Sequence, residues 1–233
     1  MNNAHGMPTP GPRGAPPSSI FGARPRDVGP RVSLPEEVAI ATVRTGNQPV
    51  LLVVDTQVGV VSGCSEARRV VQNLARVVER ARAAAVPVMW VQHGGTDLVV
   101  DSPPWQWVPE LQPAPSEPRV HKQFNSSFEQ TTLDDELAKV GATHIVLAGA
   151  ATNWCIRATA YGALDRGYDL TLVQDAHTTE TMAFEDGTRI EAASVVRELN
   201  VAMTWLRYPG RTNGTATANE IDFATPGGAR QPP

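Results

Sequence analysis

The sequence predicts an α/β fold in which helices cover both faces of a central, mostly parallel six-stranded sheet, a three-layer α/β/α arrangement of the Rossmann-like kind. Short apolar runs alternate with helical segments through residues 46–208, which is typical of parallel sheets. The runs are almost continuously apolar, as expected for strands that are buried on both faces. Several runs end in polar side chains, at the sheet edge where open α/β sheets bind ligands.

The first two predicted strands each end in a polar group. The first strand is PVLLVVD over 49–55, which ends in the carboxylate of Asp55. An amphipathic helix follows over 65–85, because its aliphatic residues fall on one stripe and its arginines lie elsewhere. The second strand is VPVMWVQH over 86–93, which ends in His93.

Residues 94–118 break this alternation, with six prolines and the side chains of Trp105 and Trp107. A segment of this length without regular structure is either a functional loop or a disordered insert. The two tryptophans favour a loop that packs on the body of the protein.

The alternation then resumes. RVHK over 119–122 predicts a third strand that ends in Lys122, and a helix is expected from Thr132 to its stop at Gly141. The remaining predicted elements are strands at 144–148, 169–174 and 201–206 and helices at 153–166 and 187–199. We therefore expect one domain over residues 46–208.

The two ends of the chain lack apolar clusters. Residues 1–45 are dense in proline and glycine and predict a flexible N-terminal arm, not a signal peptide. Residues 209–233 predict a loose C-terminal tail, which Ile221, Asp222 and Phe223 could pin to the body or to a neighbouring subunit.

Composition narrows the classes of partner. The formal net charge of −4 gives no basic surface for nucleic acid or an anionic membrane, and no apolar run approaches the roughly 20 residues of a membrane span. The two cysteines, Cys64 and Cys155, cannot form a disulfide framework, which favours a reducing cytoplasm. We expect a small-molecule partner, no nucleic acid, no membrane and a cytoplasmic location.

The stretch LAGAATNWCIRATA over 147–160 contains the candidate nucleophile. It begins as a strand, breaks at 149–152 and restarts as a helix with Cys155 near its first turn. The N–H groups and dipole at a helix start favour a thiolate. The alternative is a half-buried core cysteine, because cysteine also packs as a small hydrophobe.

Three candidate reactive groups follow three separate strands, namely Asp55, Lys122 and Cys155. The carboxyl ends of parallel strands converge on one edge, so residues distant in sequence can share a pocket there. Each residue alone has another explanation, since such an Asp is often a helix cap and a Lys is usually a surface charge. Their shared topology favours a common site.

Five ordered motifs carry a resemblance to a known family. They are VVDTQ at 53–57, VQH at 91–93, HKQFNSSF at 121–128, GAATNWCIRATA at 149–160 and LVQDAHTT at 172–179. Over residues 48–207 the chain resembles the isochorismatase-like cysteine hydrolases, a superfamily that includes nicotinamidases, carbamoylsarcosine and ureidoacrylate amidohydrolases and streptothricin hydrolase. The resemblance implies the isochorismatase-like version of the predicted fold, and homodimers or homotetramers.

The resemblance also implies roles for individual residues. Asp55, Lys122 and Cys155 match the family's catalytic triad, and a non-proline cis peptide is expected between Ala150 and Ala151. The backbone N–H groups of Ala151 and Cys155 are then expected to form an oxyanion hole.

This constellation implies hydrolysis of a C–N bond in a small amide, lactam or ureide. Asp55 would take the thiol proton of Cys155, the sulfur would attack the carbonyl, and water would hydrolyse the resulting thioester. Two alternatives remain open, namely a catalytically silent binding or scaffold protein of the same fold and a vinyl-ether hydrolase of the isochorismatase type. A dinucleotide-binding enzyme is disfavoured because no GxGxxG follows the first strand.

Expected substrate contacts lie next to these motifs. The residues predicted to line the substrate site are Gln57, His93, Phe124, Asn125 and Trp154, and further aromatic walls could come from Trp105, Trp107 and Phe128. Metal-containing relatives have an Asp-x-His motif after the second strand, whereas this chain has only His93 in that neighbourhood. Because a zinc site needs about three protein ligands, we expect no metal and no other cofactor.

Overall fold

The computed structural model of the chain describes residues 42–223. The N-terminal arm expected over residues 1–45 therefore falls almost wholly outside the described residues, as does the end of the expected tail beyond residue 223. Among the described residues, no helix is both long enough and apolar enough to cross a membrane.

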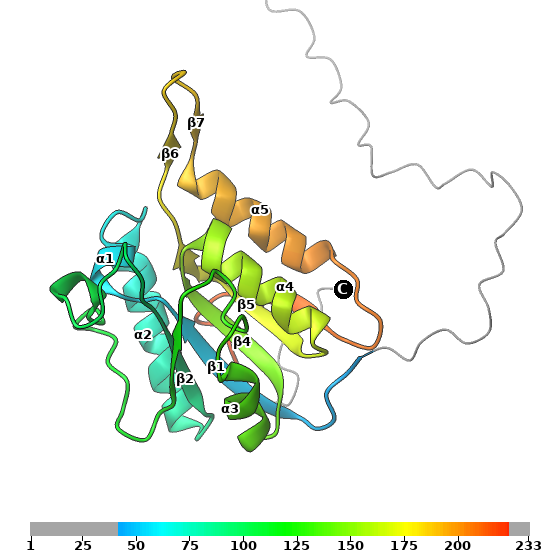
Figure 1. Cartoon of the computed structure of the whole chain (residues 1–233). Coiled ribbons are helices and arrows are strands. Elements are labelled where there is room, and N and C mark those ends of the chain that lie inside the picture. Colours follow the sequence, from blue (N-terminus) through cyan, green and yellow to red (C-terminus); the bar gives the residue numbers. More distant parts are fainter. Residues whose placement is uncertain (1–41, 224–233) are drawn as a thin grey trace, which may run out of the picture. The chain divides into compact units, whose positions relative to one another are not determined.

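A six-stranded sheet with all neighbouring strands parallel forms the centre of the fold (Figure 1). Its strands are β1 (Gln48–Val54), β2 (Val88–His93), β3 (Arg119–Lys122), β4 (Ala142–Ala150), β5 (Asp169–Thr178) and β8 (Asn213–Ala216). Their order is β3-β2-β1-β4-β5-β8, so the direction of winding reverses between β1 and β4. In open α/β sheets, ligands bind at the carboxyl ends of strands beside such a reversal.

Helices form the two outer layers. They are α1 (Val58–Val61), α2 (Ala67–Ala83), α3 (Leu133–Lys139), α4 (Arg157–Asp165) and α5 (Ala192–Trp205), with the short turns η1 (Pro103–Trp105) and η2 (Thr152–Ile156). Apolar side chains of α2 pack on one face of the sheet, and those of α3, α4 and α5 pack on the other (Figure 1). A small hairpin, β6 (Met182–Ala183) and β7 (Arg189–Ile190), precedes α5. The structure thus confirms the predicted three-layer α/β/α fold.

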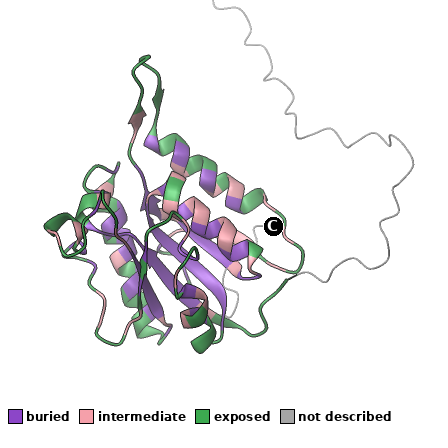
Figure 2. Ribbon diagram, in the orientation of Figure 1, coloured by how far each residue is buried: buried purple, intermediate pink, exposed green. Residues whose placement is uncertain are grey.

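Burial on both faces explains the apolar sequence of β1. Successive side chains of a strand point to opposite faces, so Leu51 and Val53 pack in the α2 layer while Val50, Leu52 and Val54 pack in the other. All five side chains are fully buried, and the central strands of the sheet are buried along most of their length (Figure 2). A run without polar residues is therefore required at this position.

The prediction of a sixth strand over 201–206 was wrong, because this segment continues helix α5 to Trp205. Val195, Leu199 and Met203 are buried at intervals of four residues, which is a helical stripe. The sixth strand is instead β8, and it lies within the segment expected to be a loose C-terminal tail. Ile221, expected to pin that tail, is buried in the α2 layer.

Strand β4 ends in an unusual backbone. Gly149 has φ of +130°, and a Cβ built there would lie 1.9 Å from the carbonyl oxygen of Val54 on β1, so only glycine fits. The following peptide, Ala150–Ala151, is cis as the resemblance implied. The pairing of β4 with β5 shifts register at this point, from Leu147 opposite Leu172 to Gly149 opposite His177.

Candidate active site

Asp55, Lys122 and Cys155 meet at the carboxyl edge of the sheet. The Nζ atom of Lys122, the last residue of β3, lies 2.7 Å from Asp55 Oδ2 and 3.2 Å from Cys155 Sγ. Asp55 directly follows β1 with φ of +51°, a left-handed conformation that aspartate adopts more readily than most residues. The convergence expected from the strand ends is therefore present in the structure.

The ammonium group of Lys122 has three partners inside the protein. Besides Asp55 and Cys155, it donates a hydrogen bond to the carbonyl oxygen of Phe124 at 3.2 Å. The side chains of Lys122 and Asp55 are both almost completely buried. A buried ammonium with three partners is a fixed internal charge and leaves no donor for a ligand.

Burial raises the pKa of Asp55 above its ordinary value, while the charge of Lys122 acts in the opposite direction. For Lys122, burial lowers the pKa, but attraction to Asp55 and Cys155 outweighs it and raises the pKa overall. Lys122 therefore stays cationic. A carboxylate with a raised pKa is a stronger proton acceptor than one exposed to water.

Burial and then the negative charge of Asp55 raise the pKa of Cys155 to about 12, although Lys122 opposes this shift. The expectation that the helix start would favour a thiolate is therefore wrong for the free protein. Cys155 lies inside the π-helical turn η2, behind its first residues, where desolvation dominates. Cys155 can therefore act as a nucleophile only if a base removes its thiol proton.

The backbone turn that carries Cys155 is wider than an α-helical turn. The carbonyl oxygen of Ala151 accepts hydrogen bonds from the N–H groups of Trp154 and Ile156, both at 3.1 Å, and skips that of Cys155 between them. This pattern follows from the π-helical widening of the turn. It suits the predicted oxyanion hole of Ala151 and Cys155.

A cavity of about 300 Å³ is lined by Ala151 and by Trp154, the residue before Cys155, but not by Asp55, Lys122 or Cys155 themselves. Of the expected substrate contacts, His93 and Trp154 line this cavity, and 54% of Trp154 is exposed. Phe124 and Asn125 are exposed but lie outside its lining. The sequence missed other lining residues, including Cys64, Asp97 and Glu180, because they lie on loops without a recognisable motif.

Gln57, expected to contact substrate, is instead fully buried. Its side-chain amide donates to the carbonyl oxygens of His93 and Trp105, each at 2.9 Å, and its Oε1 accepts the N–H of His93 at 2.9 Å. Gln57 thus fixes the proline-rich loop to the end of β2.

The proline-rich loop is packed, as its tryptophans indicated. Trp107 is buried edge-on against Trp90, with ring centroids 5.3 Å apart, and Trp105 stacks on His121 at 5.9 Å. Phe128 lies in the core, stacked on Tyr168. These aromatic residues stabilise the fold and do not line the cavity beside Ala151.

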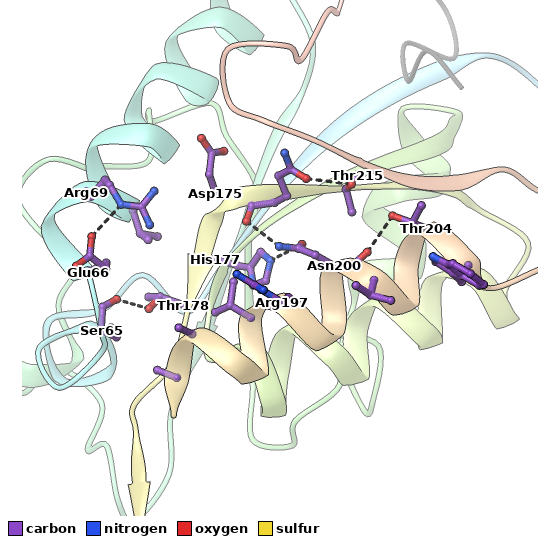
Figure 3. Close-up of a pocket in the computed structure, with 17 residues that line it drawn as sticks. Ser65, Glu66, Arg69, Asp175, His177, Thr178, Arg197, Asn200, Thr204 and Thr215 are labelled. Carbon is purple, nitrogen blue, oxygen red and sulfur yellow. Dashed lines mark hydrogen bonds and ion pairs between the residues drawn. The ribbon is translucent and has the colours of Figure 1, made fainter. Parts of the chain in front are cut away.

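His177, in the motif LVQDAHTT, has a position that the sequence did not reveal. Its ring nitrogens bond to Thr152 Oγ1 at 2.9 Å and to Asn200 Oδ1 at 3.0 Å, which links the turn after Ala151 to helix α5. It also lines a second cavity of about 510 Å³ between α2, β5 and α5 (Figure 3). This cavity includes neither Ala151 nor Cys155 in its lining.

Burial lowers the pKa of His177 to about 4, although Asn200 and Asp175 oppose this shift. The unfolded chain therefore binds a proton between pH 6.5 and 4 that the folded protein does not, so stability falls as the pH falls through this window. We expect His177→Gln to remove about 3 kcal/mol of this pH dependence, measured by urea unfolding at pH 7 and pH 4. The exposed His121 provides a control, since His121→Gln should retain the wild-type dependence.

His93 has one acidic neighbour within ion-pair distance, Asp97 Oδ1, 3.5 Å from its Nε2 atom. Within residues 42–223, no group of three or more His, Cys, Asp or Glu side chains is arranged to hold a metal ion. The absence of a metal requirement stays a prediction, which elemental analysis of protein purified without added metal would check.

The structure thus combines a parallel α/β sheet with a buried carboxylate, a buried ammonium and a partly buried thiol at the carboxyl ends of its strands. The family model for the isochorismatase domain matches residues 49–219. The chain belongs to the isochorismatase domain family, which confirms the resemblance found in its motifs.

Two named relatives are similar in sequence. The chain is 37% identical over 135 residues to a streptothricin hydrolase of Streptomyces noursei, covering 55% of this chain and 54% of that protein. It is 30% identical over 144 residues to the ureidoacrylate amidohydrolase RutB of Caulobacter segnis, covering 48% and 60%. The match thus spans little more than half the length of these curated relatives.

Solved structures show the same fold. An isochorismatase from Pseudomonas putida KT2440 is 28% identical, with a TM-score of 0.66 over 76% of this chain and 91% of that one. A cysteine hydrolase from Pseudomonas syringae pv. phaseolicola has the same TM-score at 23% identity over 74% and 90%, which supports the fold alone.

Proposed function

We propose that the protein is a cysteine-dependent hydrolase that cleaves a C–N bond of a small amide, lactam or ureide through a thioester intermediate. The observation that supports this most is the position of Lys122 Nζ, 2.7 Å from Asp55 Oδ2 and 3.2 Å from Cys155 Sγ. Covalent catalysis needs a nucleophile and a base held close together. Cys155 and Asp55 can take these two roles, with the charge of Lys122 in contact with both.

In the first half of the reaction, Asp55 takes the thiol proton and the sulfur of Cys155 attacks the carbonyl carbon. The N–H groups of Ala151 and Cys155 stabilise the oxyanion, by about 3–4 kcal/mol for each effective donor. The protonated Asp55 then gives its proton to the leaving nitrogen, which departs as ammonia or an amine and leaves a thioester on Cys155.

In the second half, Asp55 accepts a proton from water, and the hydroxide attacks the thioester. Collapse of this second oxyanion breaks the C–S bond, and the proton on Asp55 returns to sulfur. Lys122 stays protonated throughout, so its charge favours both the carboxylate form of Asp55 and the transient thiolate.

The names of the relatives agree with this chemistry, since a ureidoacrylate amidohydrolase is among them. The match covers only part of each relative, so the relatives' substrates are not assigned to this chain. The substrate class is inferred below from the residues that line the cavity. A homodimer or homotetramer and a cytoplasmic location also stay predictions. Light scattering of the purified protein and fractionation of cells would check them.

Intact-protein mass spectrometry tests the proposed intermediate. A panel of amides, lactams and ureides should release ammonia or amine, and rapid acid quenching should capture the protein with the mass of one acyl group added. The adduct should persist in Cys64→Ser, which removes the other thiol, and vanish in Cys155→Ser. Release of the amine without any acyl-enzyme, or an adduct on Cys64, would contradict the thioester pathway.

A further inference from the structure

The charge on the walls of the 300 Å³ cavity bears on the substrate. Two carboxylates, Asp97 and Glu180, line the cavity from different segments of the chain. Neither lysine nor arginine is among the described residues that line it. The nearby ammonium of Lys122 is already bonded to Asp55, Cys155 and Phe124. A ligand in this cavity therefore meets a negative field.

The loops are shaped to bring both carboxylates to this cavity. A Cβ built on Gly63 would lie 2.7 Å from Oε1 of Glu180, so the glycine leaves space for the carboxylate. Asp97 similarly lies over Gly95, where a Cβ would be 2.9 Å from its Oδ1 atom. Asp97 remains 76% exposed and Glu180 is exposed, so both can exchange solvent for a ligand.

An aromatic face completes the wall. Trp154, adjacent to the nucleophile, is 54% exposed and lines the same cavity. Indole faces and carboxylates are the two groups by which proteins recognise organic cations. A substrate carboxylate would instead face two like charges without a cation to pair with it.

We propose that the substrate carries an ammonium or guanidinium group, which Asp97, Glu180 and Trp154 hold while the scissile carbonyl lies against Ala151 and Cys155. This inference rests on the proposed function, because it names the substrate class of the same site. Anionic amides, such as one with an acrylate group, are then poor substrates.

Three amides with the same four-carbon chain on the amide carbonyl test the selection by turnover, namely δ-aminovaleramide as the cation, valeramide as the neutral compound and adipamate as the anion. We expect kcat/KM to be highest for the cation and lowest for the anion. Glu180→Gln and Asp97→Asn should each reduce the cation-to-anion ratio about threefold to tenfold. Equal kcat/KM for the three amides, or ratios unchanged in both variants, would overturn the proposal.

Alkylthiolation of Cys155 tests the same charge without turnover. In a Cys64→Ser background, the rates with aminoethyl and sulfonatoethyl methanethiosulfonate give a cation-to-anion ratio for the cavity. Glu180→Gln and Asp97→Asn should lower this ratio about threefold to tenfold, and high salt should reduce their effect. Glu79→Gln is the matched control, because this exposed carboxylate lies near the C-terminal end of α2 and does not line the cavity.

The two experiments separate the two proposals. Charge selection in alkylthiolation without turnover of any amide would support the cation site and contradict the hydrolase. Turnover of amides with no charge selection in either experiment would support the hydrolase and overturn the cation site. An effect of Glu79→Gln equal to that of Glu180→Gln would also overturn it, because the selection would then reflect net charge alone.

Discussion

Replacing Cys155 with alanine is expected to lower turnover of any amide substrate by a factor of at least about 10⁴, because the thioester cannot form without its sulfur. The fold should be retained, since alanine occupies the space of a small, partly buried thiol without introducing a polar group. Steady-state kinetics measures the loss, and circular dichroism with urea unfolding verifies the fold.

Cys64→Ala is the matched control for this prediction. It removes the other thiol of the chain, which lines the cavity but whose side chain bonds to the carbonyl oxygen of Val60 and has no interaction with Asp55 or Lys122 among those described. This variant should keep the acyl-enzyme and turnover within about tenfold of wild type. If Cys155→Ala retains the wild-type rate, the assigned nucleophile is wrong. If the wild-type protein turns over no amide at all, the scaffold alternative is favoured.

The fold was predictable wherever a strand is buried on both faces. The run PVLLVVD has no other reasonable place than the centre of a covered sheet, and β1 occupies Gln48–Val54. β8 was missed because only Ala216 of its four residues is buried, so its sequence has no apolar run. The end of α5 was missed because Val201–Leu206 alternates apolar residues over too short a window to separate strand from helix.

The convergence of Asp55, Lys122 and Cys155 was predictable because topology alone places the ends of parallel strands at one edge. The raised pKa of Cys155 was not, since it depends on burial, and burial is a property of the whole packed structure. Asp97 and Glu180 were missed for a related reason. Both residues belong to loops, and the path of a loop does not follow a periodic sequence pattern. It depends on individual contacts, such as the hydrogen bonds of Gln57 and the space that Gly63 leaves for Glu180.

Replacing Lys122 with methionine is expected to reduce the free energy of unfolding by about 3–5 kcal/mol at neutral pH. Methionine nearly matches the length of the lysine side chain, so packing changes little, but Asp55 is left buried without the ammonium 2.7 Å away. An uncompensated buried charge costs far more than the lost pair was worth. Urea unfolding of both proteins measures the difference.

The double variant Asp55→Asn with Lys122→Met separates this explanation from general damage to the core. With neither charge present, no ion remains to be desolvated, so the double variant should be more stable than Lys122→Met alone although it carries one more substitution. A double variant that is less stable than either single variant would contradict the idea that charge pairing is the main role of Lys122 in stability.

The pH dependence of Lys122→Met gives an independent check. Burial already raises the pKa of Asp55, and removing Lys122 removes the largest influence that lowers it. In the Lys122→Met variant, Asp55 therefore stays protonated in the folded state at pH values where it is ionised in the unfolded chain. The stability of the variant falls as the pH rises through these values. The stability difference from wild type should therefore shrink as the pH falls toward the ordinary pKa of aspartate. A stability difference that stays constant with pH would mean that Lys122 stabilises the protein through packing. The charge of Lys122 would then contribute to catalysis and not to stability.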